Sequence, residues 1–287
     1  MSNYKITSDT TCDLPDSYLK ENDIAIIPLY YNLNDVIYGE EINLTPHEFY
    51  DKMKEGSMPS TMACNPDTTE RIFRKILESG YDILHIAFSS ALSSSYNTAA
   101  VVGKELAEEF PDRKIIVIDS KAASMGEGLI VYNTVLNKNN GMSIEDNAKW
   151  VEDNLLNVCH LFTVNDLFHL HRGGRVSKAT AIIGTMINVK PVLHVDDEGA
   201  LVSLNNVRGR KKAINALADN MGKVIEGFNN DVIMISHGDC YDEAFALGEQ
   251  LKERYGVKEV IINYVCPTVG AHTGPGVIAL FYMGKER

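Results

Sequence analysis

Short apolar runs alternate along the chain with longer stretches in which apolar residues recur every three or four positions. In the first half, runs with the length and composition of buried strands lie at residues 4–8, 24–31, 82–88 and 114–118. Stretches with helical spacing lie at residues 67–78, 93–110, 122–136 and 143–154. A further helix is predicted over Pro46–Lys54, with Thr45 as its N-cap. Strands that alternate with helices are typical of a parallel sheet covered by helices.

The pattern changes from about residue 157, where a hairpin signal enters. Val189–Val195 and Leu201–Val207 flank the polar turn Asp196–Gly199. The other elements predicted in this half are strands at 158–164, 231–236 and 259–264, and helices at 210–226 and 242–255. A hairpin among strand–helix units indicates a mixed sheet. We therefore predict an α/β fold of two closely packed domains. Residues 1–156 form a parallel sheet with helices on both faces, and residues 157–287 a mixed sheet with helices.

Near the C-terminus, Gly270–Gly276 contains three glycines and a proline between the apolar runs Val260–Val265 and Val277–Tyr282. This composition predicts a tight turn between two strands, with His272 and Thr273 at its tip. A titratable ring beside a hydroxyl, placed on a rigid scaffold, is typical of a ligand-binding turn. A plain turn with two polar residues facing water is the alternative, and the turn alone does not separate the two.

Hydroxyl side chains gather where predicted strands end, in the segments 7–11, 58–62, 89–97 and 119–128. Ligands of open α/β sheets bind beyond the carboxyl ends of the strands. Any one of these hydroxyls, such as Ser93, is explained by helix capping. Taken together they predict a neutral, hydroxyl-lined site at a helix N-terminus, which suits an anion.

Charge and cysteine content narrow the function classes. The net charge of −12 argues against a general nucleic-acid binder. Basic residues gather in two places: Arg172, Arg175 and Lys178, and the segment Arg208–Lys212. No apolar stretch approaches the roughly 20 residues of a membrane span, and the N-terminus leads directly into a strand, so no signal peptide and no integral membrane association are expected. Five widely spaced cysteines favour a reducing compartment, hence a cytoplasmic protein without a disulfide framework or zinc site.

Several common catalytic motifs are absent from the sequence. It lacks the phosphate-binding patterns GxxxxGKS/T and GxGxxG and the nucleophile pattern GxSxG. His169 and His171, with Asp166 nearby, are too weak a pattern for a metal site, so neither metal nor cofactor is predicted. His85 and His160 lie in apolar runs and are expected to be buried and hydrogen-bonded.

Six segments resemble, in order, the motifs of the DegV family of bacterial fatty-acid-binding proteins. They are Thr7–Leu14, Pro59–Thr61, Ser89–Asn97, Leu170–Ser177, Val189–Leu193 and Gly270–Gly276. The resemblance runs from about residue 4 to residue 282. It implies two α/β domains with a long-chain fatty acid between them.

The resemblance also implies roles for particular residues. Thr61 and Ser93 would hold the fatty-acid carboxylate, and His272 and Thr273 would lie around the same head group. Met62-Ala63 and Ser94-Ser95 depart from the usual family residues beside these contacts, but the two hydroxyls are kept.

A partner follows from the resemblance as well. Arg172 and Arg175 match the family segment near which members present a basic surface to a fatty acid kinase. The kinase phosphorylates the carboxyl group to an acyl phosphate for phospholipid synthesis, so the chain would be a carrier in lipid metabolism and not itself an enzyme. Two other interpretations stay open: an acyl hydrolase that uses Ser93 and His272, and a small-anion binder that uses the basic clusters and is sensitive to salt.

Overall fold

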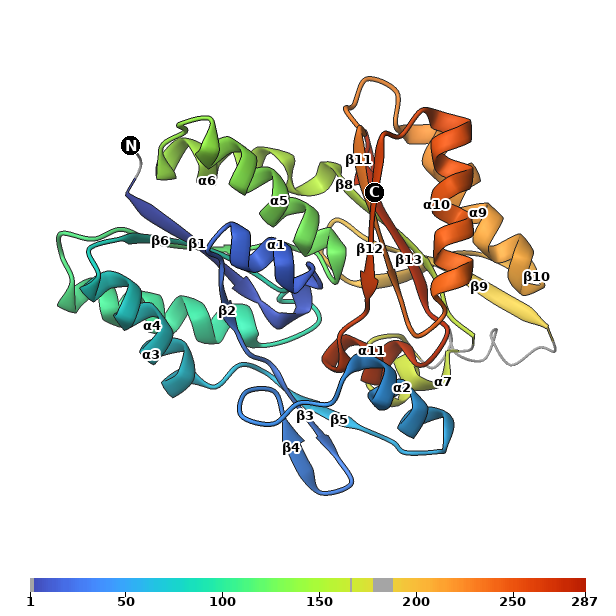
Figure 1. Cartoon of the computed structure of the whole chain (residues 1–287), viewed down its shortest axis with the longest axis horizontal. Helices are drawn as coiled ribbons and strands as arrows, with labels where there is room; N and C mark the ends of the chain where they lie inside the picture. Colours follow the sequence, from blue (N-terminus) through green and yellow to red (C-terminus); the bar gives the residue numbers. More distant parts are fainter. Residues whose placement is uncertain (1–2, 166, 178–187) are drawn as a thin grey trace.

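The computed structural model describes residues 3–165, 167–177 and 188–287. Two sheets lie side by side, and a small third sheet lies at one end of the molecule (Figure 1). The predicted α/β fold, with a parallel N-terminal sheet and a mixed C-terminal sheet, is confirmed. The boundary predicted between residues 156 and 157 falls in a 3₁₀ turn, η2 (Leu155–Asn157), directly before the first strand of the C-terminal sheet.

The N-terminal sheet is entirely parallel and is covered on both faces. Its strand order is β2 (Ala25–Ile27), β1 (Tyr4–Asp9), β6 (Asp82–Ala87) and β7 (Ile115–Asp119). Helices α3 (Pro66–Glu78) and α4 (Ser95–Glu109) cover one face, and α5 (Met125–Asn139) and α6 (Ile144–Asn154) cover the other. Alternation along β6 explains this, because Ile83 packs with the first pair of helices and Leu84 and Ile86 with the second.

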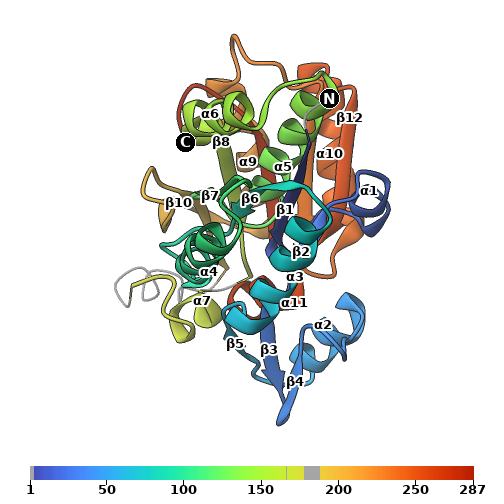
Figure 2. The same cartoon turned by 90° about the vertical axis from the view of Figure 1, so that its left-hand side faces the viewer.

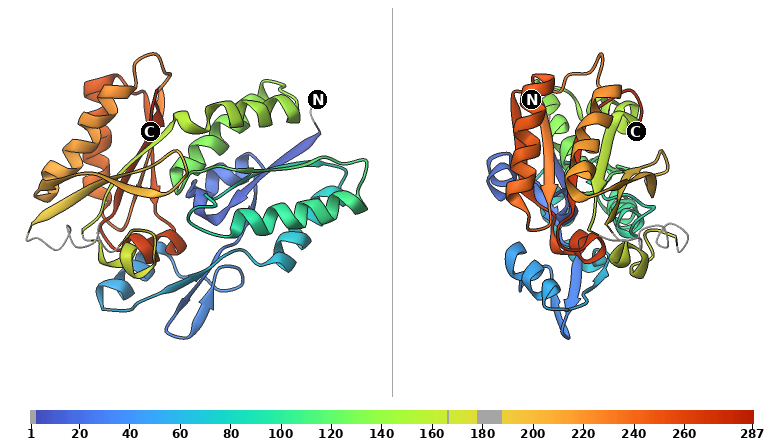
Figure 3. Two further views of the ribbon diagram at one scale, coloured as in Figure 1. Left: turned by 180° about the vertical axis from the view of Figure 1, so that it is seen from behind. Right: turned by 90° about the vertical axis from the view of Figure 1, so that its right-hand side faces the viewer.

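The C-terminal sheet is mixed, because β11 and β12 pair in parallel and the other neighbours pair antiparallel. Its order is β10 (Leu201–Arg208), β9 (Val189–Val195), β8 (Val158–Thr163), β13 (Ile278–Met283), β11 (Val232–His237) and β12 (Glu259–Tyr264). Helices α9 (Arg210–Val224) and α10 (Tyr241–Tyr255) cover the outer face (Figure 3). Helix α5 contacts β8, β11 and β13 on the inner face, so it packs between the two sheets.

The apolar run at 24–31 was predicted as one strand, and this prediction is wrong. The run divides into β2 and β3 (Tyr30–Leu33), which belong to different sheets. Pro28 lies between them and has no N–H to donate to a ladder, so the run cannot continue as one paired strand. Strand β3 instead pairs antiparallel with β4 (Val36–Tyr38) and β5 (Ser60–Met62).

Helix α2 (Pro46–Lys54) lies beside this third sheet, at the end of the molecule seen at the bottom of Figure 2. It begins as predicted, because the Thr45 hydroxyl accepts from the Glu48 N–H while the Glu48 carboxylate accepts from the Thr45 N–H. The remaining short elements are α1 (Asp16–Glu21), η1 (Thr10–Cys12) and α7 (Phe168–Arg172).

The segment Gly270–Gly276 is not the tight turn that its composition predicted. Residues Pro267–Thr273 form a short helix, α11, with Pro267 in its first turn. The turn is confined to Gly274–Gly276, where both glycines have positive φ, 76° and 81°. His272 and Thr273 therefore lie on the last turn of a helix packed between other elements.

The hydroxyl-rich segment 7–11 takes part in a buried hydrogen-bond network at the end of β1. Glu127 of α5 accepts hydrogen bonds from the hydroxyls of Ser8, at 2.7 Å, and Thr11, at 2.9 Å. The Asp9 carboxylate accepts from the Phe88 N–H at 2.8 Å. Burial raises the pKa of Glu127, and it raises the pKa of Asp9 to about 7. This segment therefore fixes α5 on the N-terminal sheet.

Asp13 joins the two halves of the chain. Its carboxylate accepts from the Ser124 hydroxyl at the start of α5 and from the Cys266 N–H at 3.0 Å. The Ser124 hydroxyl is also 2.8 Å from that of Ser236 on β11. Burial raises the pKa of Asp13 to about 7, which outweighs the stabilising effect of these donors on the carboxylate.

We predict that Asp13→Asn removes part of the pH dependence of stability. An acid whose folded pKa is raised from 3.8 to about 7 binds more protons when folded, so its contribution is full below pH 3.8 and is lost as pH rises to about 7. The wild type should therefore lose this contribution between pH 4 and pH 7, and Asp13→Asn should not. Denaturant unfolding at several pH values measures the difference. Parallel curves for the two proteins would contradict the prediction.

Candidate functional site

A cavity of about 280 Å³ lies between the two halves of the chain, and both contribute to its walls. Its size is near the lower end of the range of about 300–1,000 Å³ that is typical of small-molecule sites. Most of the lining side chains are apolar: Leu29, Met62, Ala63, Phe88, Leu92, Ala123, Phe162, Leu170, Val195, Leu201, Val265, Val269, Val277, Ala279 and Phe281. The sequence did not identify these residues, because their common surface exists only once the halves pack.

All four predicted head-group residues, Thr61, Ser93, His272 and Thr273, line this cavity. Thr61 comes from β5, Ser93 from the loop before α4, and His272 and Thr273 from α11. The Thr61 hydroxyl oxygen is 2.8 Å from Nε2 of His272. The fold thus brings together residues that are 211 positions apart in the sequence.

His272 is held as a neutral ring. Burial, and then the positive charges of Arg175 and Arg172, together lower its pKa to about 4. Its Nδ1 is buried and has no hydrogen-bond partner among the described residues. An unprotonated Nδ1 is favoured beside these cations, so we infer that the ring proton is on Nε2. This N–H then donates a hydrogen bond to the Thr61 hydroxyl oxygen. The hydroxyl hydrogen of Thr61 is then free to donate to a ligand oxygen.

Ser93 lies one residue before Ser94, the N-cap of α4, and lines the cavity. Its hydroxyl oxygen accepts from the N–H of Ser95, the first residue of α4, at 3.2 Å, and lies 2.9 Å from the Ser95 hydroxyl. The Ser95 hydroxyl accepts in turn from the Cys64 N–H at 3.3 Å, two residues beyond β5. The first turn of α4 therefore lies at the cavity beside Ser93, and its N–H groups and dipole favour negative charge there.

Arg175, which the resemblance assigned to a partner-facing surface, lines the cavity. Its guanidinium donates to the Leu92 carbonyl at 3.0 and 2.7 Å and also to the Gly173 carbonyl. The prediction of a site without fixed charge was therefore incomplete. The sequence did not show this because Leu92 and Arg175 meet only in the folded chain.

Arg172 is exposed, yet it also ties two site segments together. Its guanidinium donates to the Pro59 carbonyl at 2.8 Å and to the Ala271 carbonyl at 3.2 Å. These carbonyls lie next to the segments that carry Thr61 and His272. Lys178 and Asp166, which the sequence placed near this region, lie outside the described residues.

Glycine is required at each of the two positions before Arg175, for a different structural reason. A Cβ on Gly173 would lie 2.0 Å from Nδ1 of His272, so only glycine lets this backbone approach the ring. Gly174 has a φ of 72°, a conformation that other residues rarely adopt. The pair therefore allows the chain to pass His272 and turn Arg175 into the cavity.

The nucleophile and base of the alternative hydrolase are not assembled. Nε2 of His272 is engaged with Thr61, and the Ser93 hydroxyl with Ser95. A histidine whose pKa is lowered to about 4 is also a weak base at neutral pH. The geometry therefore suits binding of an oxygen-rich head group better than proton abstraction from Ser93.

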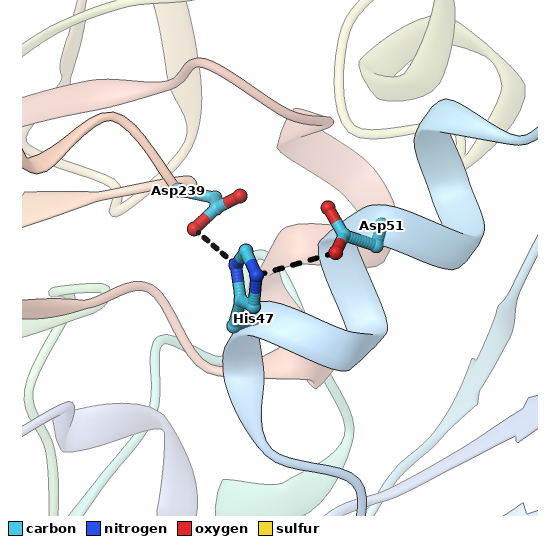
Figure 4. A group of neighbouring side chains, drawn as sticks. All are labelled: His47, Asp51 and Asp239. Atoms are coloured by element: carbon cyan, nitrogen blue, oxygen red, sulfur yellow. Dashed lines mark hydrogen bonds and ion pairs between the residues drawn. The ribbon is translucent and has the colours of Figure 1, made fainter.

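The described residues include one group with metal-ligand chemistry, His47, Asp51 and Asp239, whose ligand atoms lie within 4.8 Å of one another (Figure 4). The imidazole lies between the carboxylates, with Nδ1 2.9 Å from Asp239 and Nε2 3.3 Å from Asp51. Lys54 also pairs with both carboxylates. The hydrogen bond and charge of Asp239, then the charge of Asp51, raise the pKa of His47. Cationic side chains thus already balance this cluster, which links α2 to the loop after β11.

Comparisons with known proteins match nearly the whole chain. A family model described as an uncharacterised protein of the DegV family covers residues 3–285. A DegV domain-containing protein of Clostridium perfringens is 40% identical over 289 residues, which is 100% of this chain and 99% of that protein.

Solved structures match equally well. A fatty-acid-binding DegV family protein from Thermus thermophilus has a TM-score of 0.88 and 30% identity, covering 98% of this chain and 99% of the other. A stearic-acid-binding protein from Eubacterium ventriosum has a TM-score of 0.88 and 27% identity, covering 98% of each chain. In the described part of this chain, no helix has the length and apolar character that crossing a membrane requires.

We predict that Gly173→Ala displaces the His272 ring and raises its pKa toward 6.5. The new Cβ would overlap Nδ1, so the ring must leave Thr61 and become more accessible to water. An NMR titration of the histidine rings measures this pKa. Gly248→Ala on α10 is a matched control, because its Cβ would meet side-chain atoms of Val260 and Ile262 at 3.2–3.7 Å and Gly248 does not line the cavity. A His272 pKa still near 4 in Gly173→Ala would refute the assigned contact.

Proposed function

The chain belongs to the DegV family, and we propose that it binds one long-chain fatty acid in the cavity, with the carboxylate beside Thr61 and Ser93. The observation that carries this proposal is the division of the cavity walls. Hydroxyls, a neutral imidazole and a helix N-terminus gather at one end, and the rest is lined mainly by apolar side chains. The fatty-acid-binding proteins from Thermus thermophilus and Eubacterium ventriosum, with the same fold, support the choice of ligand.

Burial of the alkyl chain supplies most of the expected affinity. A sixteen-carbon acid buries about 14 methylenes at about 0.8 kcal/mol each, on the order of 11 kcal/mol before the costs of association. A hydrogen bond to the carboxylate adds roughly 1.5–3 kcal/mol. The tail therefore provides the affinity, and the hydroxyls fix which end of the bound acid lies beside them.

The head-group end offers donors without a strong ion pair. The Thr61 hydroxyl is free to donate once His272 donates to it, and Ser93 lies beside the first turn of α4. Arg175 adds positive charge nearby, but its guanidinium is already bonded to two backbone carbonyls. A carboxylate held mainly by hydroxyls keeps more of its nucleophilicity than one in a bidentate arginine pair.

Binding of the carboxylate mainly by hydroxyls suits a carrier that presents this carboxylate to a fatty acid kinase. We propose that the kinase phosphorylates the bound acid to an acyl phosphate for lipid metabolism, and that this chain performs no catalysis of its own. Arg172 remains the candidate for a partner-facing residue, because its side chain is exposed beside the segments that carry Thr61 and His272. No cofactor or metal takes part in this role.

We predict that Thr61→Val and Ser93→Ala each weaken fatty-acid binding by roughly 10- to 100-fold, because each removes one charge-assisted hydrogen bond. Native mass spectrometry of purified protein titrated with palmitate measures the loss. Ser79→Ala at the end of α3 is the matched control, because the Ser79 hydroxyl donates to the Lys75 carbonyl and Ser79 does not line the cavity. A wild-type protein that takes up no acid would refute the proposed function, and turnover of an acyl ester would favour the hydrolase. Binding that weakens steeply with salt would favour the small-anion interpretation.

The carrier role has a separate test. Arg172→Glu should lower the rate of ATP-dependent acyl phosphate formation by a purified fatty acid kinase at least tenfold, since it reverses a charge on the expected docking surface. Arg172→Lys, which keeps the charge, should retain most of the rate. The bound acid is quantified in the same samples, so a loss of loading is not mistaken for a loss of docking. Equal rates in all three loaded proteins would exclude Arg172 from the partner surface.

A further inference from the structure

Strand β13 gives the cavity a direction, because it starts beside the head-group residues and runs away from them. Val277, Ala279 and Phe281 line the cavity, as expected for alternate residues on one face of a strand. Val277 is separated from Thr273 only by the turn Gly274–Gly276, whereas Phe281 lies about 13 Å further along at roughly 3.3 Å per residue. Phe281 therefore marks the end of the cavity that is distant from the carboxylate site.

Phe281 and His160 are the last pair of facing residues on β13 and β8 that lines the cavity. His160 is the register partner of Phe281 on β8, as Phe162 is the partner of Ala279. All four side chains line the cavity. Met283, the next residue of β13 on the same face, does not line it. Along β8 and β13 the cavity lining therefore ends at His160 and Phe281, and Val195 and Leu201 continue it sideways on β9 and β10.

The imidazole of His160 is fixed by its surroundings. The Ala123 N–H donates to Nε2 at 3.2 Å, so Nδ1 carries the proton and donates to the Val158 carbonyl at 3.0 Å. Phe281 packs edge-on against the ring, with centroids 5.3 Å apart. On α5, a Cβ on Gly126 would come within 2.0 Å of Nε2, which shows how closely this helix approaches the ring.

We propose that the His160 ring is the end stop that limits the length of the acyl chain. Both nitrogens are engaged with backbone groups, so the ring offers carbon atoms to the methyl end of the ligand. A longer chain can extend only by displacing the ring, which would break two hydrogen bonds of buried backbone groups. A flexible side chain would move aside for a longer acid, whereas the hydrogen-bonded His160 ring stays in position. The inference rests on the proposed fatty-acid binding and adds the residue that sets chain length.

The test is competition among saturated fatty acids of twelve to twenty carbons, added in equal amounts and detected by native mass spectrometry. The wild type should show an upper limit of length. His160→Ala should shift the bound population to longer acids, with relative affinity rising by about fourfold for each additional buried methylene. His160→Phe keeps a ring at this position and should keep the limit. His85→Ala is the matched control, since His85 is equally buried on β6 but does not line the cavity.

The outcomes separate this inference from the proposed function. An unchanged length distribution in loaded His160→Ala would overturn the end stop and leave fatty-acid binding intact. No bound acid in any protein, wild type included, would overturn both. If His160→Ala does not fold, Phe281→Leu opens the other half of the last pair. Longer acids in that variant would support a stop at this pair, and an unchanged distribution would overturn it.

Discussion

The burial of the first two turns of α5 between the two sheets is the constraint on which the rest of the structure depends. Every residue from Met125 to Val131 is buried. Gly126 lies against the His160 ring of the C-terminal sheet, and Gly128 against the Cys12 carbonyl of the N-terminal half, where a Cβ would come within 2.4 Å. Between these glycines, Glu127 is held by the hydroxyls at the end of β1. The helix thus joins both halves, and the residues at its start, Ala123 and Ser124, form part of the cavity wall.

A second constraint acts at the other end of the cavity, where polar groups lie in an apolar surrounding. Burial and the nearby positive charges of Arg175 and Arg172 disfavour a protonated His272, so the ring stays neutral and can orient the Thr61 hydroxyl. The arginines are held by backbone carbonyls of the segments that carry the hydroxyls. Charge is therefore used here chiefly to position loops, and neutral donors remain for the ligand. This division is consistent with a site that must hold a carboxylate without neutralising it.

Local patterns predicted many elements well. Thr45 as N-cap and Pro46 at the first helical position predicted the start of α2, and the alternation of apolar runs and amphipathic stretches predicted most strands of the two main sheets. The predictions failed where a short-range pattern has two solutions. The run at 24–31 is apolar enough for one strand, but Pro28 divides it between two sheets. Gly270–Gly276 contains the residues of a turn, but Gly270 lies within helix α11 because of packing, since a Cβ there would meet the Tyr50 hydroxyl at 2.5 Å.

The sequence by itself determined the fold class, the negative net charge, and the hydroxyl and histidine side chains that line one part of the cavity. These follow from periodicity, composition and motifs, which are local properties of the chain. Only the tertiary structure decided that Arg175 turns into the cavity, that His272 bonds to Thr61 rather than to Ser93, and that His160 closes the far end. Each of these depends on distances between segments more than 30 residues apart. Such distances are set by the packing of α5 and the register of β8 against β13, which no local pattern encodes.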